Sequence, residues 1–178
     1  MINGINSRDM ILEILLEIEE GEHSHVAIRN ALSKYQFLPK QDRAFITRVC
    51  EGTLEYRIQI DYIINSFSKV TVDKMKPAIR EILRSAVYQL KYMDSVPDSA
   101  VCNEAVKLAQ RKGFYNLKPF VNGVLRTIAR EMDQVRFPQK EDDLLKYLSV
   151  KYSMPEVLVT RWLEAYGEET TEKILADF

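Results

Sequence analysis

The chain has 178 residues, of which 46% are hydrophobic and 29% charged, a composition that suits a globular protein with a sizeable core and excludes a disordered chain. The formal net charge of −1 hides a division, since residues 23–137 carry 19 basic and 11 acidic side chains whereas residues 1–22 and 138–178 are acidic. A basic middle permits a surface that binds RNA or phosphate, although cations that merely keep helices solvated give the same count. The apolar runs are shorter than the roughly 20 residues needed to cross a membrane.

The first part of the chain shows apolar residues at helical spacing, and no useful length alternates as a strand would. Ser7 is expected to cap the first helix and Gly21 to end it. Gly52 lies inside a later helix, where it more often allows close packing than chemistry, and Asp61 is expected to pair with an arginine or to cap a helix. Helices are predicted at about residues 7–20, 24–35, 41–56 and 58–67.

The central stretch, Ile79–Arg130, predicts three more helices separated by two turns. The first turn, around Pro97, leads into a helix that Asp98 or Ser99 is expected to cap. Gly113 ends that helix as a left-handed residue, and the last of the three helices ends before residues 137–138. With the segments that follow, these patterns predict an all-α protein of roughly eight to ten helices.

The character of the sequence changes after Pro138. A short amphipathic helix is predicted at 140–152, and Ser153 with Glu156 forms a capping box for a helix that ends at Gly167. A final helical piece follows at about 169–176. We therefore expect two units, a helical bundle over residues 1–137 and a helical linker subdomain over residues 138–178.

Side chains for catalysis or metal binding are scarce. His23 and His25 have no third ligand type nearby, and Cys50 and Cys102 lie beside apolar helical rows, which favours buried small side chains over nucleophiles. The glycines stand singly, so neither a phosphate loop nor a dinucleotide motif is present. Two cysteines without a secretory segment predict a cytoplasmic protein. From the residues alone, the chain is a binding module without a metal or cofactor of its own.

Basic residues follow helical spacing in the central stretch. Lys76, Arg80 and Arg84 are four residues apart, and so are Arg126 and Arg130, so each set lines one side of a helix. If the helices form a bundle, these cations can meet others near the Gly113 turn, with aromatic rings available for stacking on bases. The alternative is that Arg80 and Arg84 pair with acidic residues, which we expect for Arg84. The residues that the turn and its neighbourhood add are Lys107, Arg111, Lys112, Phe114, Tyr115 and Lys118.

These segments resemble a known family. Over about residues 40–132 the ordered motifs are similar to the NusB fold, and they are most similar to its version at the amino end of RsmB-type (Sun/Fmu) ribosomal RNA cytosine-C5 methyltransferases. Residues 147–169 resemble the helical linker that precedes the catalytic domain in those enzymes, whereas a stand-alone antitermination factor normally stops near residue 135–140. The motifs read DRAFITRVCEGTLEYR, EILRSAVYQLKYMDSVP, NEAVKLAQRKG and FVNGVLRTIARE.

The resemblance implies a NusB-like helical bundle with a C-terminal helical linker extension, which binds 16S ribosomal RNA. It also implies a C-terminal methyltransferase domain in cis that uses S-adenosylmethionine and catalytic cysteines in Pro-Cys and Thr-Cys settings, so the chain is expected to be a fragment that is inactive by itself. Neither cysteine of this chain has that setting. In NusB factors basic residues at the start of the first helix contact RNA, and here only Arg8 lies there, beside Asp9 and Glu13.

Two alternatives stay open at this point. The chain is also compatible with a stand-alone NusB-like antitermination factor that binds leader RNA and a ribosomal protein, or with a protein-interaction module that lacks RNA affinity, as the acidic ends suggest. For the RNA-binding hypothesis, the candidate residues are Arg126, Arg130, Lys76, Arg80, Arg111, Lys112, Lys118, Arg43 and Arg8.

Overall fold

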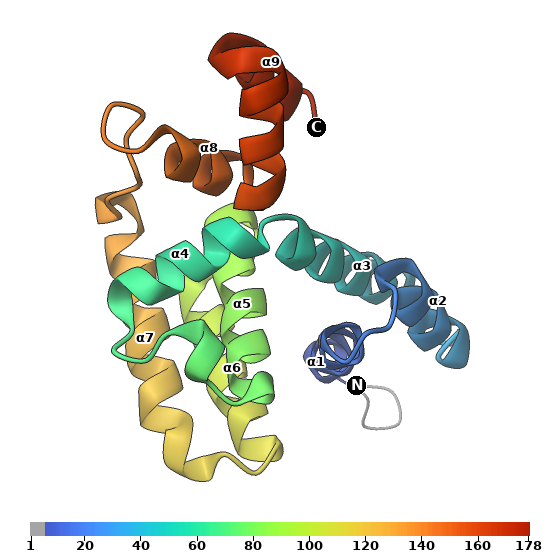
Figure 1. Cartoon of the computed structure of the whole chain (residues 1–178). Coiled ribbons are helices and arrows are strands. Elements are labelled where there is room, and N and C mark those ends of the chain that lie inside the picture. The colour runs from blue at the N-terminus through green and yellow to red at the C-terminus, as the bar shows by residue number, and fades with distance from the viewer. Residues whose placement is uncertain (1–5) are drawn as a thin grey trace.

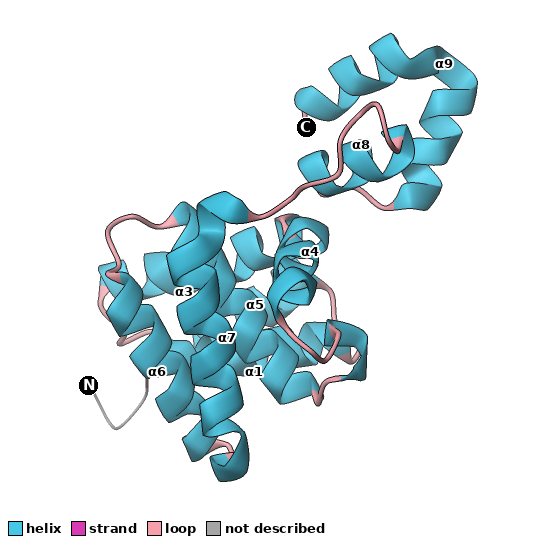
Figure 2. Ribbon diagram, turned by 90° about the vertical axis from the view of Figure 1, so that its left-hand side faces the viewer, coloured by secondary structure: helices cyan, strands magenta, loops and turns pink. Residues whose placement is uncertain are grey.

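A computed structural model describes residues 6–178, and this part of the chain folds into nine α-helices with three short 3-10 turns and no strand (Figures 1 and 2). The predicted all-α class is therefore confirmed. In this described part no helix is long and apolar enough to span a membrane. The helices are α1 (Ser7–Glu19), α2 (Ser24–Lys34), α3 (Lys40–Glu55), α4 (Arg57–Phe67), α5 (Pro77–Tyr92), α6 (Asp98–Arg111), α7 (Lys118–Glu131), α8 (Leu144–Tyr152) and α9 (Glu156–Ala176).

Helix α5 is the centre of the larger bundle. It packs against α1, α3, α4, α6 and α7, and every residue from Glu81 to Gln89 is buried. A helix that is enclosed on all sides must satisfy its polar groups within the protein, because a buried polar group without a partner is costly. Two arginines of α5 accordingly pair with acids on neighbouring helices, Arg80 with Glu19 and Arg84 with Asp61.

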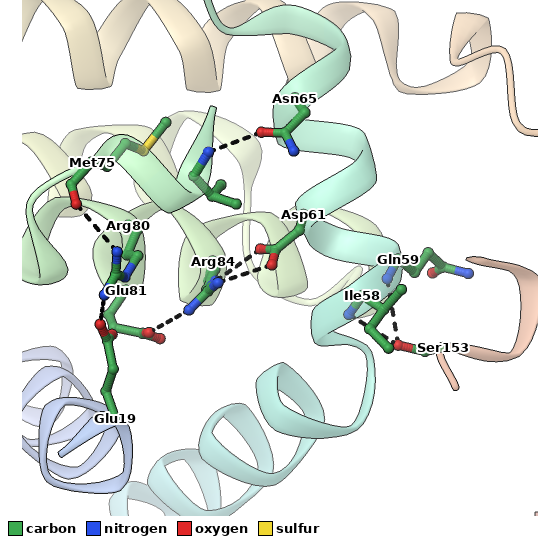
Figure 3. Close-up of polar contacts among 11 residues, drawn as sticks. Glu19, Ile58, Gln59, Asp61, Asn65, Met75, Arg80, Glu81, Arg84 and Ser153 are labelled. Atoms are coloured by element: carbon green, nitrogen blue, oxygen red, sulfur yellow. Dashed lines mark hydrogen bonds and ion pairs between the residues drawn. The ribbon is translucent and has the colours of Figure 1, made fainter. Parts of the chain in front are cut away.

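Arg84 of α5 illustrates this placement (Figure 3). Its Nε and Nη2 donate to the two carboxylate oxygens of Asp61 on α4, at 2.8 and 2.9 Å, and its Nη1 donates to Glu81 at 2.6 Å. Burial raises the pKa of both acids, while the Arg84 guanidinium acts in the opposite direction. Burial also acts to lower the pKa of Arg84, but the hydrogen bonds and charges of the two acids raise it. The structural role expected for Arg84, and the arginine partner expected for Asp61, are confirmed.

Gly52 allows α3 to approach α5 closely. A Cβ atom at this position would overlap the ring of Tyr88, which is buried at 6% exposure. Tyr88 is in turn held by Tyr56 and Tyr92, whose ring centroids lie 6.5 and 5.4 Å from its own. The packing role predicted for Gly52 is therefore confirmed.

A second, smaller core lies between α8 and α9, formed by Leu148, Val159 and Leu175. It joins the larger bundle at α4: the Ser153 hydroxyl accepts hydrogen bonds from the backbone N–H groups of Ile58 and Gln59, at 3.2 and 3.4 Å. The two cores lie on either side of the junction near residue 138. The division into domains at 137–138 itself stays a prediction.

Several predicted helix ends differ from the structure. Asn6, not Ser7, caps α1 by accepting from the N–H of Arg8 at 2.8 Å, and neither Asp98 nor Ser99 caps α6, which Pro97 precedes without a side-chain bond. Ser153 adopts a left-handed conformation after α8 instead of capping α9, because its hydroxyl serves α4. Helix α8 begins only at Leu144. The predicted break at Gly167 is confirmed, because its backbone is non-helical, with a φ of +79°, and divides α9 into two helical pieces at a kink.

Glu172 of α9 organises the smaller unit. Its carboxylate accepts a hydrogen bond from Lys140 at 2.9 Å and another from the Tyr152 hydroxyl at 2.9 Å, and Lys151 lies 3.7 Å away. The Tyr147 hydroxyl lies 3.4 Å from the same carboxylate. The hydrogen bond from Lys140 is the main cause that lowers the pKa of Glu172.

This lowered pKa predicts a pH-dependent stability for the α8–α9 unit. Because the folded-state pKa lies below the ordinary 4.5, the stabilisation is present above that value and is lost as pH falls through the lowered one. We expect the urea midpoint followed by the fluorescence of Trp162, the only tryptophan, to drop between about pH 6 and about pH 3. Glu172→Gln is expected to reduce this drop. The control is Glu169→Gln, which changes an exposed carboxylate paired with Lys173 of the same helix and should leave the drop unchanged. Equal pH profiles for both variants would contradict the prediction.

Candidate nucleic-acid interface

The α6–α7 hairpin carries cations on its outer face. The two helices run antiparallel and are joined by a turn in which Gly113 has a φ of +89°, as predicted for a left-handed end of α6. Their apolar residues face the core, with Val101, Leu108 and Leu125 buried, so the polar positions between them are left at the surface.

Arg126 occupies the middle of this face. Its Nη2 donates to Asn103 of α6 at 2.7 Å and its Nε to Asn122, one turn earlier on α7, at 3.1 Å. Both partners are neutral amides, so they orient the guanidinium without cancelling its charge. A fixed cation with hydrogen-bonding capacity left over suits contact with a phosphate.

Three further cations lie on the hairpin. Near the turn, Lys118 donates to Gln110 at 2.9 Å and lies 4.5 Å from the ring centroid of Tyr115, which is 63% exposed. Lys107 and Arg130 are exposed, and each lies beside an acidic residue of its own helix, at 3.7 and 3.2 Å. Such exposed pairs contribute little energy and open readily for another anion. We define the hairpin surface as Lys107, Tyr115, Lys118, Arg126 and Arg130.

Four other predicted RNA-binding residues contact other helices of the protein, and the pairs made by Arg111 and Lys112 lie at the surface. Arg111 and Lys112 pair with Asp9 and Glu13 of α1, at 3.2 and 2.6 Å. Arg80 pairs with Glu19, which is also on α1, and not with the acids of α4 or α5 (Figure 3). Arg43 of α3 donates to two backbone carbonyls at the end of α2, at 2.8 and 3.1 Å. These hydrogen bonds anchor α3 to α2.

Arg8 and Lys76 complete the predicted set. Arg8 is half-buried: it lies 3.4 Å from the side-chain oxygen of Gln89 and 5.2 Å from the centroid of Phe45, and burial lowers its pKa. Lys76 is exposed just before α5 and forms no ion pair with the described residues. The structure thus groups Lys118, Arg126 and Arg130 on one hairpin, whereas RNA contact by any of the nine residues stays a prediction.

The structure also brings together cations that the sequence did not single out. Lys91, Arg136, Lys146 and Lys151 lie around the junction between the two cores. Their sequence positions follow no common helical spacing, since they come from α5, the connecting segment and α8. Only the packing of residues 135–151 against α4 and α5 reveals them as neighbours.

The cysteines and histidines lie apart from these surfaces. Cys50 and Cys102 are both fully buried, as predicted, and burial raises the pKa of each thiol, so neither is a reactive nucleophile. His23 and His25 are exposed on the segment around the start of α2. Within residues 6–178 no cluster of three or more His, Cys, Asp or Glu side chains has metal-binding geometry.

The fold defines the class of protein as an all-helical bundle of the NusB type. A crystal structure of the antitermination factors NusB and NusE in complex with dsRNA matches with a TM-score of 0.64 and 22% identity, over 70% of this chain and 93% of the matched one. The crystal structure of PH0851 matches with a TM-score of 0.72 and 21% identity, over 97% of this chain and 38% of the other. The model of the NusB family matches residues 5–130, and the chain belongs to that family.

Two kinds of curated relative match to different extents. A probable ribosomal RNA small subunit methyltransferase B of Bacillus subtilis is 36% identical over 94% of this chain, which spans 37% of that relative. A transcription antitermination protein NusB of Dictyoglomus thermophilum is 32% identical over 72% of this chain and 85% of its own length. The chain therefore spans about two fifths of the methyltransferase but most of the antitermination protein.

Proposed function

We propose that this chain is the RNA-binding amino-terminal region of a 16S ribosomal RNA cytosine-C5 methyltransferase. The observation that carries the proposal is the extent of the two matches. The antitermination relative matches 72% of this chain, whereas the methyltransferase matches 94%, so the similarity to the methyltransferase extends over much of α8 and α9. A NusB-like bundle that continues into this particular extension favours the methyltransferase.

The hairpin surface is the proposed contact for ribosomal RNA. Its cations are held on rigid helices, and Arg126 has only neutral hydrogen-bond partners. Positive side chains at helical spacing can follow a phosphate backbone, and the exposed ring of Tyr115 can stack on an unpaired base. The structure of NusB and NusE with dsRNA supports RNA as the class of ligand for this fold.

Methyl transfer itself is assigned to a domain in cis beyond the matched region. A nucleophilic thiol must reach the target cytosine, and both cysteines of this chain are buried with raised thiol pKa values. The single glycines of the sequence do not form the loop that would hold S-adenosylmethionine. In the proposal the cofactor belongs to the catalytic domain, this chain delivers the RNA, and the location is the cytoplasm.

A stand-alone antitermination factor is the second candidate, favoured by the match to a NusB protein over 85% of that protein's length. Reading the coding sequence past codon 178 separates the two candidates. A glycine-rich cofactor motif followed by Pro-Cys and Thr-Cys dipeptides supports the methyltransferase, and a stop codon at that point removes it.

The RNA contact predicts a defined salt dependence. Replacing Arg126 and Arg130 together by alanine is expected to reduce the slope of log affinity against log salt concentration by roughly one to two for a 16S ribosomal RNA hairpin, because each phosphate contact contributes about 0.7–0.9. The measurement is fluorescence anisotropy of the labelled hairpin across a salt series, with the fold checked by circular dichroism.

A matched control removes two charges elsewhere. Arg29 and Lys34 are exposed cations of α2, which Figure 1 shows on the opposite side of the molecule from α7. Their double alanine variant loses the same charge, so it corrects for the general field of the protein. If both double variants change the slope equally, the hairpin surface is not the contact; if the unmodified chain shows no salt response, only a protein-interaction role remains.

A further inference from the structure

A groove lies where the second core meets the larger bundle. Two adjoining hollows, of about 600 and 240 Å³, share Phe137, Pro138 and Gln139 as a common wall. The larger hollow reaches Tyr62 of α4 and Lys146 of α8, and the smaller one continues past Lys91 and Tyr147. We call this the junction groove, and its lining residues used here are Tyr62, Lys91, Arg136, Phe137, Lys146, Tyr147 and Lys151.

Aromatic rings form much of the junction groove. Phe137 stacks on Tyr62 with centroids 5.7 Å apart and planes 22° apart, and the Tyr62 hydroxyl donates to the carbonyl of Arg136 at 2.6 Å. This hydrogen bond ties the connecting segment to α4. The position of the ring wall is therefore fixed by the packing of the two units.

Each ring that borders the smaller hollow has a cation beside it. The ammonium of Lys91 lies 5.6 Å from the centroid of Phe137, and that of Lys151 lies 5.2 Å from the centroid of Tyr147. A ring next to a positive charge offers a stacking platform and a phosphate contact at about the spacing of one nucleotide. The pairing occurs twice in one groove.

The charge of the groove favours an anionic ligand. Lys91, Arg136 and Lys146 form no ion pair with the described residues, whereas Lys151 lies 3.7 Å from Glu172. The two acids that line the groove are both exposed, and one of them accepts from the backbone of Lys146 at 3.0 Å as the cap of α8. Four cations against these two acids, Asp142 and Asp143, leave the groove positive.

We propose that the junction groove is a second RNA site, which holds a short run of unpaired nucleotides; this rests on the proposed RNA-binding function. An RNA duplex presents its backbone and 2′-hydroxyl groups and keeps its bases stacked internally, so it makes little use of aromatic walls. An acidic peptide matches the charge but supplies no flat partner for the rings. Unpaired nucleotides provide both phosphates and bases, so they match the cations and the rings together.

The groove also continues the path of the hairpin surface. Arg130 lies in the last turn of α7, and only a 3-10 turn at Met132–Gln134 separates that helix from Arg136 and Phe137. Figure 1 shows the end of α7 leading directly into the segment that joins α8. An RNA held along the hairpin by its backbone is thus directed toward the groove, where its unpaired end or loop can be bound.

The test compares a single-stranded RNA of about ten nucleotides with the duplex of the same sequence, using the whole chain. Arg136→Gln with Lys146→Gln removes two exposed charges without removing a side-chain bond. For the single strand, this double variant is expected to lower the salt slope by about 1.4, since each phosphate contributes about 0.7. Duplex affinity is expected to stay within about twofold of the unmodified chain.

A pair of variants at Tyr147 tests the rings. Tyr147→Phe and Tyr147→Leu both remove the hydroxyl that contacts Lys151 and Glu172, and only the second removes the ring. With 2-aminopurine in the single strand, we expect the quenching caused by stacking to persist in the phenylalanine variant and to be lost in the leucine variant. Folding of each variant is checked through the fluorescence of Trp162, which packs against the second core.

The possible outcomes separate this inference from the proposed function. If Arg126→Ala with Arg130→Ala weakens RNA binding but the Arg136→Gln and Lys146→Gln pair does not, the groove is not an RNA site and the proposed function stands. If the unmodified chain binds neither RNA, the proposed function falls and the groove site with it. If a polyglutamate peptide competes as well as RNA of equal charge, and quenching is the same in both Tyr147 variants, the groove binds acidic protein segments and the inference is wrong.

Discussion

Replacing Arg84 by methionine is expected to lower the free energy of unfolding by about 3–5 kcal/mol, the largest effect we expect from one substitution in this chain. The guanidinium is the shared partner of Asp61 and Glu81, whose side chains are 22% and 6% exposed. Methionine fills a similar volume but leaves two carboxylates close together without a cation bonded to either, and Arg57 acts on them only as a more distant charge. Uncompensated buried charge, not the loss of packing, is therefore the cause of the destabilisation.

The same variant is expected to recover stability on acidification. Burial already raises the pKa of Asp61 and Glu81, and removing the Arg84 charge that opposes burial raises it further. An acid whose folded-state pKa is raised above its unfolded value binds its proton more tightly in the folded state, so folding becomes more favourable as pH falls through that range. Urea unfolding followed by circular dichroism at about pH 7.5 and about pH 5 should show a smaller difference from the unmodified chain at the lower pH.

Arg80 provides the matched control, since it lies one turn before Arg84 on α5. Its pair with Glu19 joins α5 to α1, so removing Arg80 leaves one carboxylate without its partner, whereas removing Arg84 leaves two carboxylates that lie close together. Arg80→Met is expected to cost about 1 kcal/mol and to gain less stability at lower pH than Arg84→Met, because Arg80 is the weakest of the charges that lower the pKa of Glu81. If the two variants lose the same stability at both pH values, the Arg84 cluster is not a buried charge network and the prediction is wrong.

The helical fold could be predicted from the sequence because the apolar rows of α1 and α3 to α7 are long and regular. Helix ends were harder, since the competing groups lie far along the chain. Ser153 looks like a cap for α9 within its own segment, yet its hydroxyl accepts hydrogen bonds from Ile58 and Gln59 on α4. A local pattern cannot show that a distant helix offers the same side chain better partners.

The candidate site shows the same limit in its charges. The sequence made Arg111 and Arg126 equal candidates, but Arg111 pairs with Asp9, 102 positions earlier, whereas the side chains that accept from Arg126 in the described residues are amides. Arg84 could be assigned to the interior because it sits within an apolar row. The junction groove could not be predicted at all, because its residues become neighbours only when α8 docks on α4, beside the end of α5.

Replacing Gly52 by alanine is expected to destabilise the chain by about 1–3 kcal/mol, although alanine is the better helix former by about 1 kcal/mol. The new methyl group would overlap the Tyr88 ring, which is buried and packs beside the stacked pair of Tyr56 and Tyr92, so it cannot move aside without disturbing that packing. Either α3 separates from α5 or the tyrosine stack rearranges. Both changes remove contacts at the centre of the larger bundle.

Gly123 of α7 gives the opposite expectation for the same chemical change. A Cβ atom there has no neighbour within 4 Å, so Gly123→Ala is expected to raise the free energy of unfolding by up to about 1 kcal/mol through helix propensity alone. Combining Gly52→Ala with Tyr88→Ala removes the overlap, so the double variant should lose about 0.5–3 kcal/mol less than the sum of the single losses. Urea unfolding of the four variants measures all of these terms. If Gly52→Ala is stabilising, or if the losses in the double variant are additive, the contact between α3 and α5 does not depend on the absence of a side chain at position 52. If the double variant instead loses less than the sum, Gly52 belongs with Arg84 among the residues that fix how α5 is enclosed.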